Sequence, residues 1–114
     1  MISLLLTIFS LTYNISVVKA AEPLIISGIV TAYSSDVDQT DDSPFIMANN
    51  KRVHEGAIAS NCLPFGTKVV IESRVYTVED KLNRRYDCRS FDIWMASKKE
   101  AKLFGRQELN VEVL

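Results

Sequence analysis

The stretch "LPFGTKVVIESRVYTVED", residues 63–80, combines a turn with two adjoining strand patterns. Pro64 fixes one φ angle and Gly66 permits an unusual one, which predicts a tight turn at the start of the stretch. The residues at 68–73 and 74–80 are together rich in valine, isoleucine and aromatic or β-branched neighbours, and we expect them to pair as strands. This stretch therefore favours a sheet of short strands joined by tight turns.

Further strand patterns lie on both sides of this stretch. Residues 24–33 are β-branched and apolar, and Gly28 within them predicts a bulge or the close approach of another segment. A polar, turn-rich loop is expected at 34–44. Shorter strands are expected at residues 56–61, 90–95 and 110–114, and residues 45–50 are expected to start as a short strand and end in a turn. The chain is therefore predicted to be mainly β.

One segment near the C-terminus has a helical pattern. Ser97 is suited to cap the N-terminus, and Glu100 follows three residues later, as in a capping box. Ala101 and Phe104 mark an apolar face, and Gly105 is suited to end the helix. Many short strands with one helix of about two turns favour a compact β-barrel.

Residues 1–20 have the pattern of a secretory signal peptide. An uncharged apolar run covers Leu4 to Leu11, and Val18 and Ala20 are the small residues that a signal peptidase requires before the cut. The run is too short for a good transmembrane helix. We expect cleavage to leave residues 21–114 as one domain, secreted or in the periplasm or cell envelope, with no stable membrane insertion. An uncleaved anchor is the alternative interpretation.

The charges are balanced and mixed in sign. The chain has 13 Lys and Arg residues, 14 Asp and Glu residues and a formal net charge of −1. No basic stripe is interleaved with aromatic residues, so nucleic acid is not an expected partner. Arg84 and Arg85 are predicted to be surface charges rather than binders of an anionic glycan. His54 lies in a polar stretch and is predicted to be a loop residue rather than a base.

The two cysteines, Cys62 and Cys88, are predicted to form a disulfide in an oxidising compartment. Two free buried thiols or a metal pair are the alternatives, although two cysteines and one histidine are too few for a zinc site of usual spacing. No metal or organic cofactor is expected. A disulfide would bring the two Cα atoms within about 7 Å. It would tie the turn at Asn61 to the segment that precedes Asp92.

Asp80 and Asp92 stand at the polar ends of two apolar strand patterns, with a third carboxylate, Asp87, between them. Such aspartates are most often turn or cap residues. Two carboxylates held together in a groove would instead support acid–base chemistry, because each charge raises the pKa of the other group. Strand alternation points Thr31 and Tyr33 to one face, where both can line a groove, and core packing is an equal interpretation for Tyr33.

Six motifs occur in order along the chain. They are "TAYSS" (31–35), "GAIASN" (56–61), "LPFGTKVVI" (63–71), "YTVED" (76–80), "FDIWM" (91–95) and "EAKLFGRQELNVEVL" (100–114). Their order and spacing resemble the three-aspartate, or 3D, domain family, over nearly all of residues 29–114. That family is similar to the catalytic barrel of membrane-bound lytic transglycosylase A. The resemblance implies a small six-stranded double-psi β-barrel with one short helix.

The resemblance also implies a function and a set of site residues. Enzymes similar to these cleave the MurNAc–GlcNAc bond of peptidoglycan strands, and the C6 hydroxyl of the muramic acid attacks to give a 1,6-anhydro product. The family's third aspartate falls on Asp92, the expected acid and base, and the second falls on Asp80, which would raise the pKa of Asp92 or orient it. The first position is occupied by Asn61, which would hold the pair or the substrate, with Thr31 and Tyr33 beside it in the groove. A turn residue before Cys62 is the alternative interpretation of Asn61.

Two departures from the family keep other functions open. Asn61 cannot carry charge, and "DKLNRRYDC" (80–88) replaces a glycine-rich groove segment found in many relatives. Both departures favour the alternative of a non-catalytic glycan-binding barrel, similar to expansin-like domains. A small interaction or structural domain is a third interpretation. A homodimer is also open, because the chain lacks the second domain that completes the cleft in membrane-bound lytic transglycosylase A.

Overall fold

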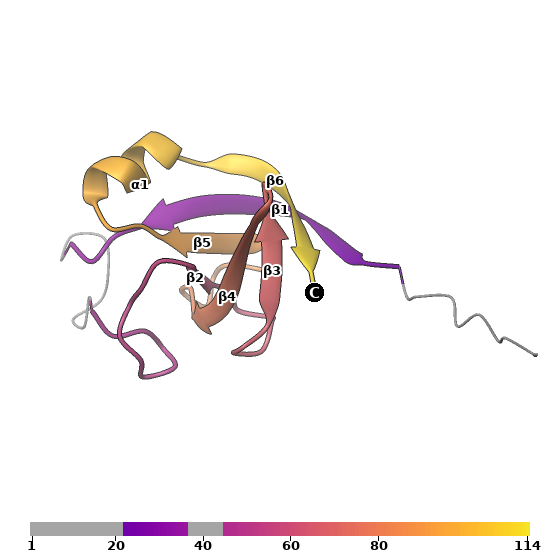
Figure 1. Cartoon of the computed structure of the whole chain (residues 1–114), viewed down its shortest axis with the longest axis horizontal. Helices are drawn as coiled ribbons and strands as arrows, with labels where there is room; N and C mark the ends of the chain where they lie inside the picture. The colour runs from indigo at the N-terminus through magenta and orange to yellow at the C-terminus, as the bar shows by residue number, and fades with distance from the viewer. Residues whose placement is uncertain (1–21, 37–44) are drawn as a thin grey trace, which may run out of the picture.

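Residues 22–36 and 45–114 are described by the structure, a computed structural model (Figure 1). In these ranges the chain forms six strands and one helix. The strands are Leu24–Tyr33 (β1), Ala57–Ala59 (β2), Lys68–Ile71 (β3), Arg74–Asp80 (β4), Ser90–Trp94 (β5) and Gln107–Val113 (β6), and the helix is Lys98–Phe104 (α1). The expected signal peptide at 1–20 and most of the expected loop at 34–44 lie outside the described residues.

The six strands close into one barrel, in the order β1-β5-β2-β4-β3-β6. β1 and β5 are parallel, β2 and β4 are parallel, and the other neighbouring pairs are antiparallel. The prediction of a mainly β, six-stranded barrel with one short helix is therefore confirmed. The mixed, closed arrangement is consistent with a double-psi barrel.

Alternate residues of the strands fill the barrel interior. Val30, Ile58, Val69, Phe91 and Val111 come from five different strands, and all five are completely buried. Because side chains of a strand point alternately to its two faces, the neighbours of these residues point out of the barrel. The outward positions on β1 and β5 are the ones that form the site described below.

Gly28 lies where β1 comes closest to the core side chains. A Cβ atom at this position would lie 2.9 Å from Cγ2 of Val111 and 3.1 Å from Cδ2 of Phe91. Real Cβ atoms do not approach other carbons so closely, so a side chain here would displace the core. The predicted close approach at Gly28 is confirmed.

The strands β3 and β4 form the predicted hairpin, with a shorter first strand than expected. β3 ends at Ile71, and Glu72 and Ser73 form the turn with φ angles of 48° and 65°. A two-residue hairpin turn with positive φ at both residues matches the twist of the strands. Glycine or asparagine usually signals such a turn, and neither occurs here. The prediction therefore included the two turn residues, 72 and 73, in the first strand.

The short strand expected at the start of 45–50 is wrong, and the turn expected at its end is confirmed. Within it only Ile46 joins an isolated bridge, to Arg52, and the N–H of Met47 donates to the carbonyl of Lys51 at 2.9 Å. The segment therefore turns back on itself. A closed barrel has no free edge to which another strand could add.

Two other strands differ from expectation in length. β2 covers three residues of the predicted segment 56–61, and β6 begins at Gln107 rather than at residue 110. The first half of β6 alternates half-buried with exposed positions, and polar residues occupy the exposed ones. Because these exposed residues are polar, the sequence did not predict that the strand begins at residue 107.

The helix begins and ends as predicted. The Ser97 hydroxyl accepts a hydrogen bond from the N–H of Glu100 at 3.1 Å, and Gly105 ends the helix with a φ angle of 65°. Ala101 is buried, and Phe104 packs against the core. The helix lies against β1 and carries the chain from β5 to β6 (Figure 1).

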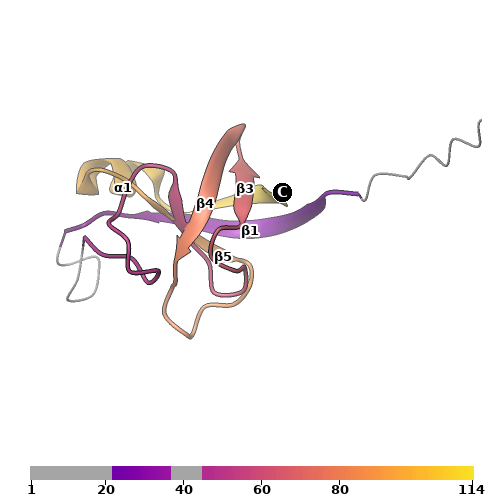
Figure 2. The ribbon, with the colours of Figure 1, turned by 60° about the horizontal axis from the view of Figure 1, so that its bottom comes forward.

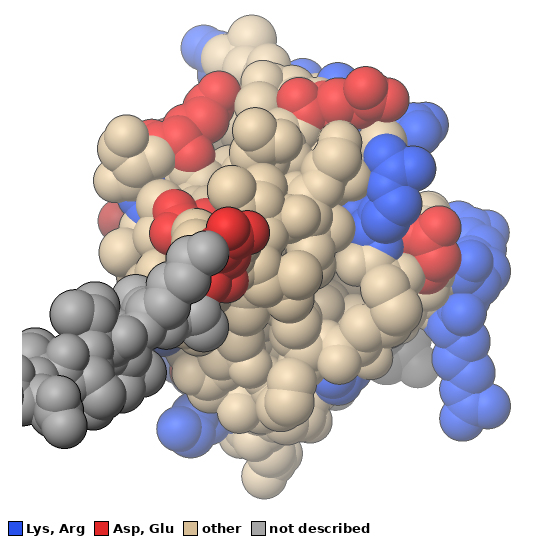
Figure 3. Space-filling view, turned by 90° about the vertical axis from the view of Figure 1, so that its right-hand side faces the viewer, with Lys and Arg blue, Asp and Glu red and all other residues tan. Residues whose placement is uncertain are grey.

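The face of the molecule that Figure 3 shows has mixed charges. Uncharged residues occupy its centre, and acidic and basic side chains surround them (Figure 3). No helix in the described part of the chain is long and apolar enough to cross a membrane.

Candidate functional site

The connection between β4 and β5, residues 81–89, is called the β4–β5 loop here. Figure 2 shows it projecting from the end of β4 before it returns to β5. A disulfide joins Cys88 in this loop to Cys62, which follows β2, and the two Cα atoms are 5.2 Å apart. The predicted disulfide is confirmed, and it is typical of a protein in an oxidising compartment.

Asn61 attaches the same loop by hydrogen bonds. Its side-chain amide donates to the carbonyls of Asn83 at 2.9 Å and Tyr86 at 3.2 Å, and its side-chain oxygen accepts from the N–H of Leu82 at 2.9 Å. Both ends of the amide are therefore used by the loop backbone. Asn61 and the neighbouring disulfide together hold the loop against the barrel.

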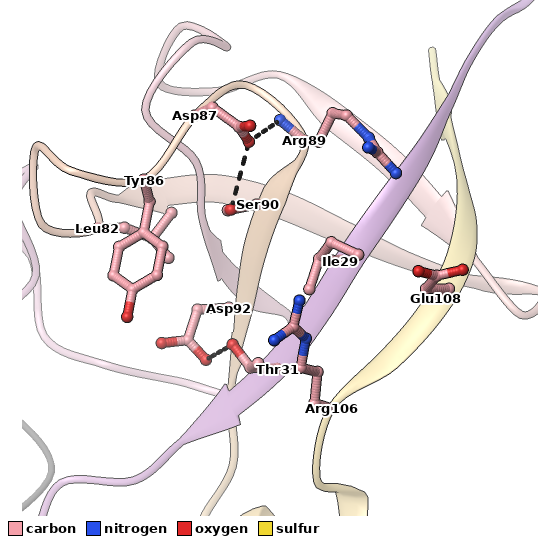
Figure 4. Close-up of a pocket in the computed structure, with 10 residues that line it drawn as sticks. All are labelled: Ile29, Thr31, Leu82, Tyr86, Asp87, Arg89, Ser90, Asp92, Arg106 and Glu108. Atoms are coloured by element: carbon pink, nitrogen blue, oxygen red, sulfur yellow. Dashed lines mark hydrogen bonds between the residues drawn. The ribbon is translucent and has the colours of Figure 1, made fainter.

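A pocket of about 640 Å³ lies between the β4–β5 loop and the outer side of the barrel (Figure 4). Outward-facing residues of β1 and β5 form its floor in register, with Ile29 opposite Ser90 and Thr31 opposite Asp92. The remaining walls come from the loop and from the start of β6. The other lining residues are Leu82, Tyr86, Asp87, Arg89, Arg106 and Glu108.

Asp92 is a partly buried carboxyl on the floor of this pocket. The Thr31 hydroxyl donates a hydrogen bond to its Oδ1 at 2.9 Å. Burial raises the pKa of Asp92 from 3.8 to about 6, the negative charge of Asp80 adds to the rise, and the Thr31 hydrogen bond acts in the opposite direction. Asp92 therefore exists in both protonation states near pH 6, as a group that gives and takes back a proton must.

Asp80 lies in a different hydrogen-bond environment. Its Oδ2 accepts from the Tyr33 hydroxyl at 2.7 Å, and its Oδ1 accepts from the N–H groups of Ala48 at 2.8 Å and Lys81 at 2.9 Å. Burial and the bond to Asp80 raise the pKa of Tyr33 well above its usual value, so its hydroxyl remains a donor. Three donors fix the Asp80 carboxylate in place.

The barrel topology brings the two aspartates near each other. Ala59 of β2 pairs with Asp80 of β4 on one side and with Asp92 of β5 on the other. Asp80 contributes charge to the site but is not among the residues that line the pocket. Of the residues expected from the sequence, Asp92 and Thr31 line the pocket. Asp80 and Tyr33 instead bond to each other, and Asn61 bonds to the backbone of the β4–β5 loop.

Several pocket residues were not expected from the sequence. Arg89 is anchored by its Nε, which donates to the carbonyl of Ser27 at 2.9 Å, and Arg106 stands immediately before β6. The alternation of residues along β1 predicted which face Ile29 shares with Thr31. No pattern in the sequence predicted that Arg106, far away in the chain, lines the same pocket. The predicted surface arginine Arg85 lies over the Tyr86 ring, 4.9 Å from its centroid.

His54 lies in a loop, as predicted, and its Nε2 contacts the carboxylate of Glu79. In residues 22–36 and 45–114, no group of three or more His, Cys, Asp or Glu side chains is placed to hold a metal ion. The chain was compared with known proteins: no family model matches it, and no curated protein matches it significantly.

Proposed function

We propose that this protein cleaves cell-wall glycan in the manner of a lytic transglycosylase, with a 3D-type double-psi barrel as its catalytic domain. The substrate is the MurNAc–GlcNAc linkage of peptidoglycan, and the products carry a 1,6-anhydro sugar. One observation carries the proposal: Asp92 is a carboxyl with a pKa of about 6 on the floor of a pocket of about 640 Å³. A pocket of that size is typical of small-molecule and sugar-unit sites.

The proposed reaction uses Asp92 twice. Protonated Asp92 gives its proton to the glycosidic oxygen as the bond to the muramic acid C1 breaks. The C6 hydroxyl of the same sugar then bonds to C1 and gives its proton to the Asp92 carboxylate. The acid is restored, and no water or cofactor is consumed. The raised pKa suits both halves of this cycle.

The position of Asp80 favours this mechanism over hydrolysis with two working carboxylates. Both oxygens of Asp80 already accept hydrogen bonds, from Tyr33 on one side and from two backbone N–H groups on the other. A nucleophile or a base that activates water must flank the bond that is cleaved, and Asp80 does not line the pocket. Asp80 therefore supports Asp92 through its charge and leaves the chemistry to one carboxyl.

The asparagine at position 61 is compatible with this mechanism. Burial is the largest cause of the raised pKa of Asp92, so the acid does not depend on a third carboxylate. Asn61 holds the β4–β5 loop through bonds in which its amide donates twice. An aspartate could not donate these bonds.

A non-catalytic glycan-binding barrel is the second candidate. Tyr86 favours it, because this loop tyrosine lines the pocket and is 41% exposed. An aromatic ring that remains accessible in a pocket presents an apolar face on which a sugar ring can pack. Under either function, the disulfide supports a secreted or cell-envelope location, where peptidoglycan is found.

A product assay tests the proposal. Purified, oxidised protein is incubated with peptidoglycan beside the variants Asp92→Asn and Glu108→Gln, and 1,6-anhydro-muropeptides are measured by mass spectrometry. We expect Asp92→Asn to lose at least about 100-fold in rate, the usual contribution of a general acid, and Glu108→Gln to retain activity as the matched pocket carboxylate. Reducing-end products without the anhydro ring would contradict the mechanism. Retained glycan pull-down with no product from any variant would establish the binding module.

A further inference from the structure

The pocket beside Asp92 contains two arginines that the proposed reaction does not use. Arg89 is held by its bond to the carbonyl of Ser27. Arg106 makes no hydrogen bond or ion pair with any residue in the described part of the chain, and its side chain lines the pocket (Figure 4). An arginine that lines a pocket without a partner is available for an anion in the ligand.

The charge of Arg106 is not used to stabilise Asp92. The pKa of Asp92 depends on burial, on the Thr31 hydroxyl and on Asp80, and no arginine contributes. The carboxylate of Asp87 is likewise occupied: its Oδ1 accepts from the N–H of Arg89 at 2.9 Å and from the Ser90 hydroxyl at 3.5 Å. The guanidinium therefore faces the pocket volume rather than a fixed internal partner.

The neighbouring charges limit the kind of anion that can bind. Asp87, Asp92 and Glu108 line the same pocket as the two arginines. A phosphate with two negative charges would be repelled by these acids more strongly than a carboxylate with one. The planar guanidinium also matches the two oxygens of a carboxylate. The pocket is thus suited to a ligand with a single negative charge.

We propose that Arg106 determines specificity by binding a carboxylate of the glycan, so that the pocket prefers an acidic sugar unit to a neutral one. The identity of the glycan rests on the proposed function. In peptidoglycan a carboxylate has two sources: the lactyl group of a muramic acid without its peptide, and the free carboxylates of the peptide stem. Arg106 lines the same pocket as Thr31, the partner of Asp92, so the acidic unit is bound in the pocket where the bond is cleaved.

The test compares three soluble tetrasaccharides. The first is a neutral GlcNAc oligomer, the second is a peptide-free GlcNAc–MurNAc oligomer with free lactyl carboxylates, and the third carries peptides that amidate the lactyl groups. Binding is titrated by NMR in the full chain with Asp92→Asn, so that no ligand is cleaved. Arg106→Gln is compared with Arg74→Gln, an exposed arginine on the β3–β4 hairpin outside the pocket, and with Arg106→Lys, which keeps a point charge.

We expect a carboxylated ligand to bind about tenfold more tightly than the neutral one, as for one charge-assisted contact at a partly exposed site. Arg106→Gln should abolish this preference, Arg106→Lys should retain part of it, and Arg74→Gln should leave it intact. The preference should also weaken as salt is added. The ligand that keeps the preference, lactyl or peptide-bearing, identifies the source of the carboxylate.

The inference would be overturned by equal affinity for neutral and acidic ligands, by an acidic preference that survives Arg106→Gln, or by no binding of any ligand at millimolar concentration. Tighter binding of a phosphate-bearing sugar than of a carboxylated one would also overturn it. The outcome is separable from that of the product assay. If the acidic preference depends on Arg106 but no anhydro products form, the inference about Arg106 is supported and the proposed transglycosylase activity is contradicted. If anhydro products form but the acidic preference is absent, the activity is supported and the inference about Arg106 is contradicted.

Discussion

Asp92 on β5 and Asp80 at the end of β4 are the same residue type in opposite environments. Each pairs with Ala59, from the two sides of β2. Asp92 is partly buried and receives one side-chain hydrogen bond, from Thr31, and its pKa rises to about 6. Asp80 accepts three hydrogen bonds, from one hydroxyl and two backbone N–H groups. The surroundings of each carboxylate, burial around Asp92 and three donors around Asp80, separate the acid from its support.

The largest effect is expected from removing the disulfide. Replacing both Cys62 and Cys88 by serine opens a loop of 26 residues and should lower the free energy of unfolding by about 3–4 kcal/mol. Because the β4–β5 loop covers Asp92, the pKa of Asp92 should also move back toward 3.8, while the bonds of Asp80 persist. Urea denaturation and NMR titration of the carboxyls measure both effects. An unchanged Asp92 pKa in a destabilised variant would mean that the loop does not bury the acid.

The next prediction concerns the dependence of stability on pH. The folded-state pKa of Asp92, about 6, lies above its ordinary value of 3.8. Folding thus favours the protonated form, and this contribution to stability is fully present below about pH 4 and is lost as the pH rises through about 6. Asp92→Asn removes the loss, so the variant should be more stable than the parent by about 2 kcal/mol at pH 8 and equal to it below pH 4.

Urea denaturation of both proteins at pH 4 and pH 8 checks this prediction. Glu108→Gln serves as control, because it removes a carboxylate from the same pocket and its stability difference from the parent should not follow this pH dependence. If the parent were more stable than Asp92→Asn at pH 8, the fold would stabilise the charged form of Asp92. The proposed difference between the environments of Asp92 and Asp80 would then be contradicted.

Asp80→Asn should act in the opposite direction at neutral pH. An amide nitrogen in place of one oxygen leaves either Tyr33 or the two backbone donors without an acceptor, which should cost about 1–2 kcal/mol of unfolding free energy. The pKa of Asp92 should fall below about 6, because a negative charge that raises it is removed. Thermal unfolding and carboxyl titration test both statements, with Glu72→Gln at the exposed β3–β4 turn as control. A rise in the Asp92 pKa would refute the supporting role of Asp80.

The smallest change removes the side-chain hydroxyl of Thr31, which donates a hydrogen bond to Asp92. Thr31→Val keeps the side-chain shape but not the hydroxyl, which favours the charged carboxylate. The pKa of Asp92 should rise above about 6, and stability at pH 8 should fall by about 1 kcal/mol. NMR titration of Asp92 decides, with Thr77→Val as control because the Thr77 hydroxyl contacts Lys68 instead. A pKa that falls would contradict the hydrogen-bond assignment.

Local patterns were sufficient where neighbouring residues set the structure. The helix cap at Ser97 and the helix end at Gly105 depend on bonds within one turn, and both were predicted. The pairing of Cys62 with Cys88 followed from a count of two cysteines. Gly28 marked a close approach because a missing side chain is visible in the sequence.

Local patterns failed where distant segments decide the outcome. The apolar start of 45–50 looks like a strand, but the closed barrel offers it no edge. Asn61 was expected to hold the substrate or the pair of acids. Its amide instead bonds to a loop more than 20 residues away, and no local feature of the sequence showed that contact.

The sequence by itself determined that this is a mainly β chain with one capped helix, a disulfide and two aspartates at strand ends, because alternation, capping and cysteine count act over short distances. Only the tertiary structure decided that Asp92 is partly buried with one side-chain donor, that three donors fix Asp80, and that Arg106 lines the pocket of Asp92. A pKa and a pocket depend on which groups surround a side chain in space. In this barrel those groups come from β1, from the β4–β5 loop and from the start of β6, which are far apart in the chain.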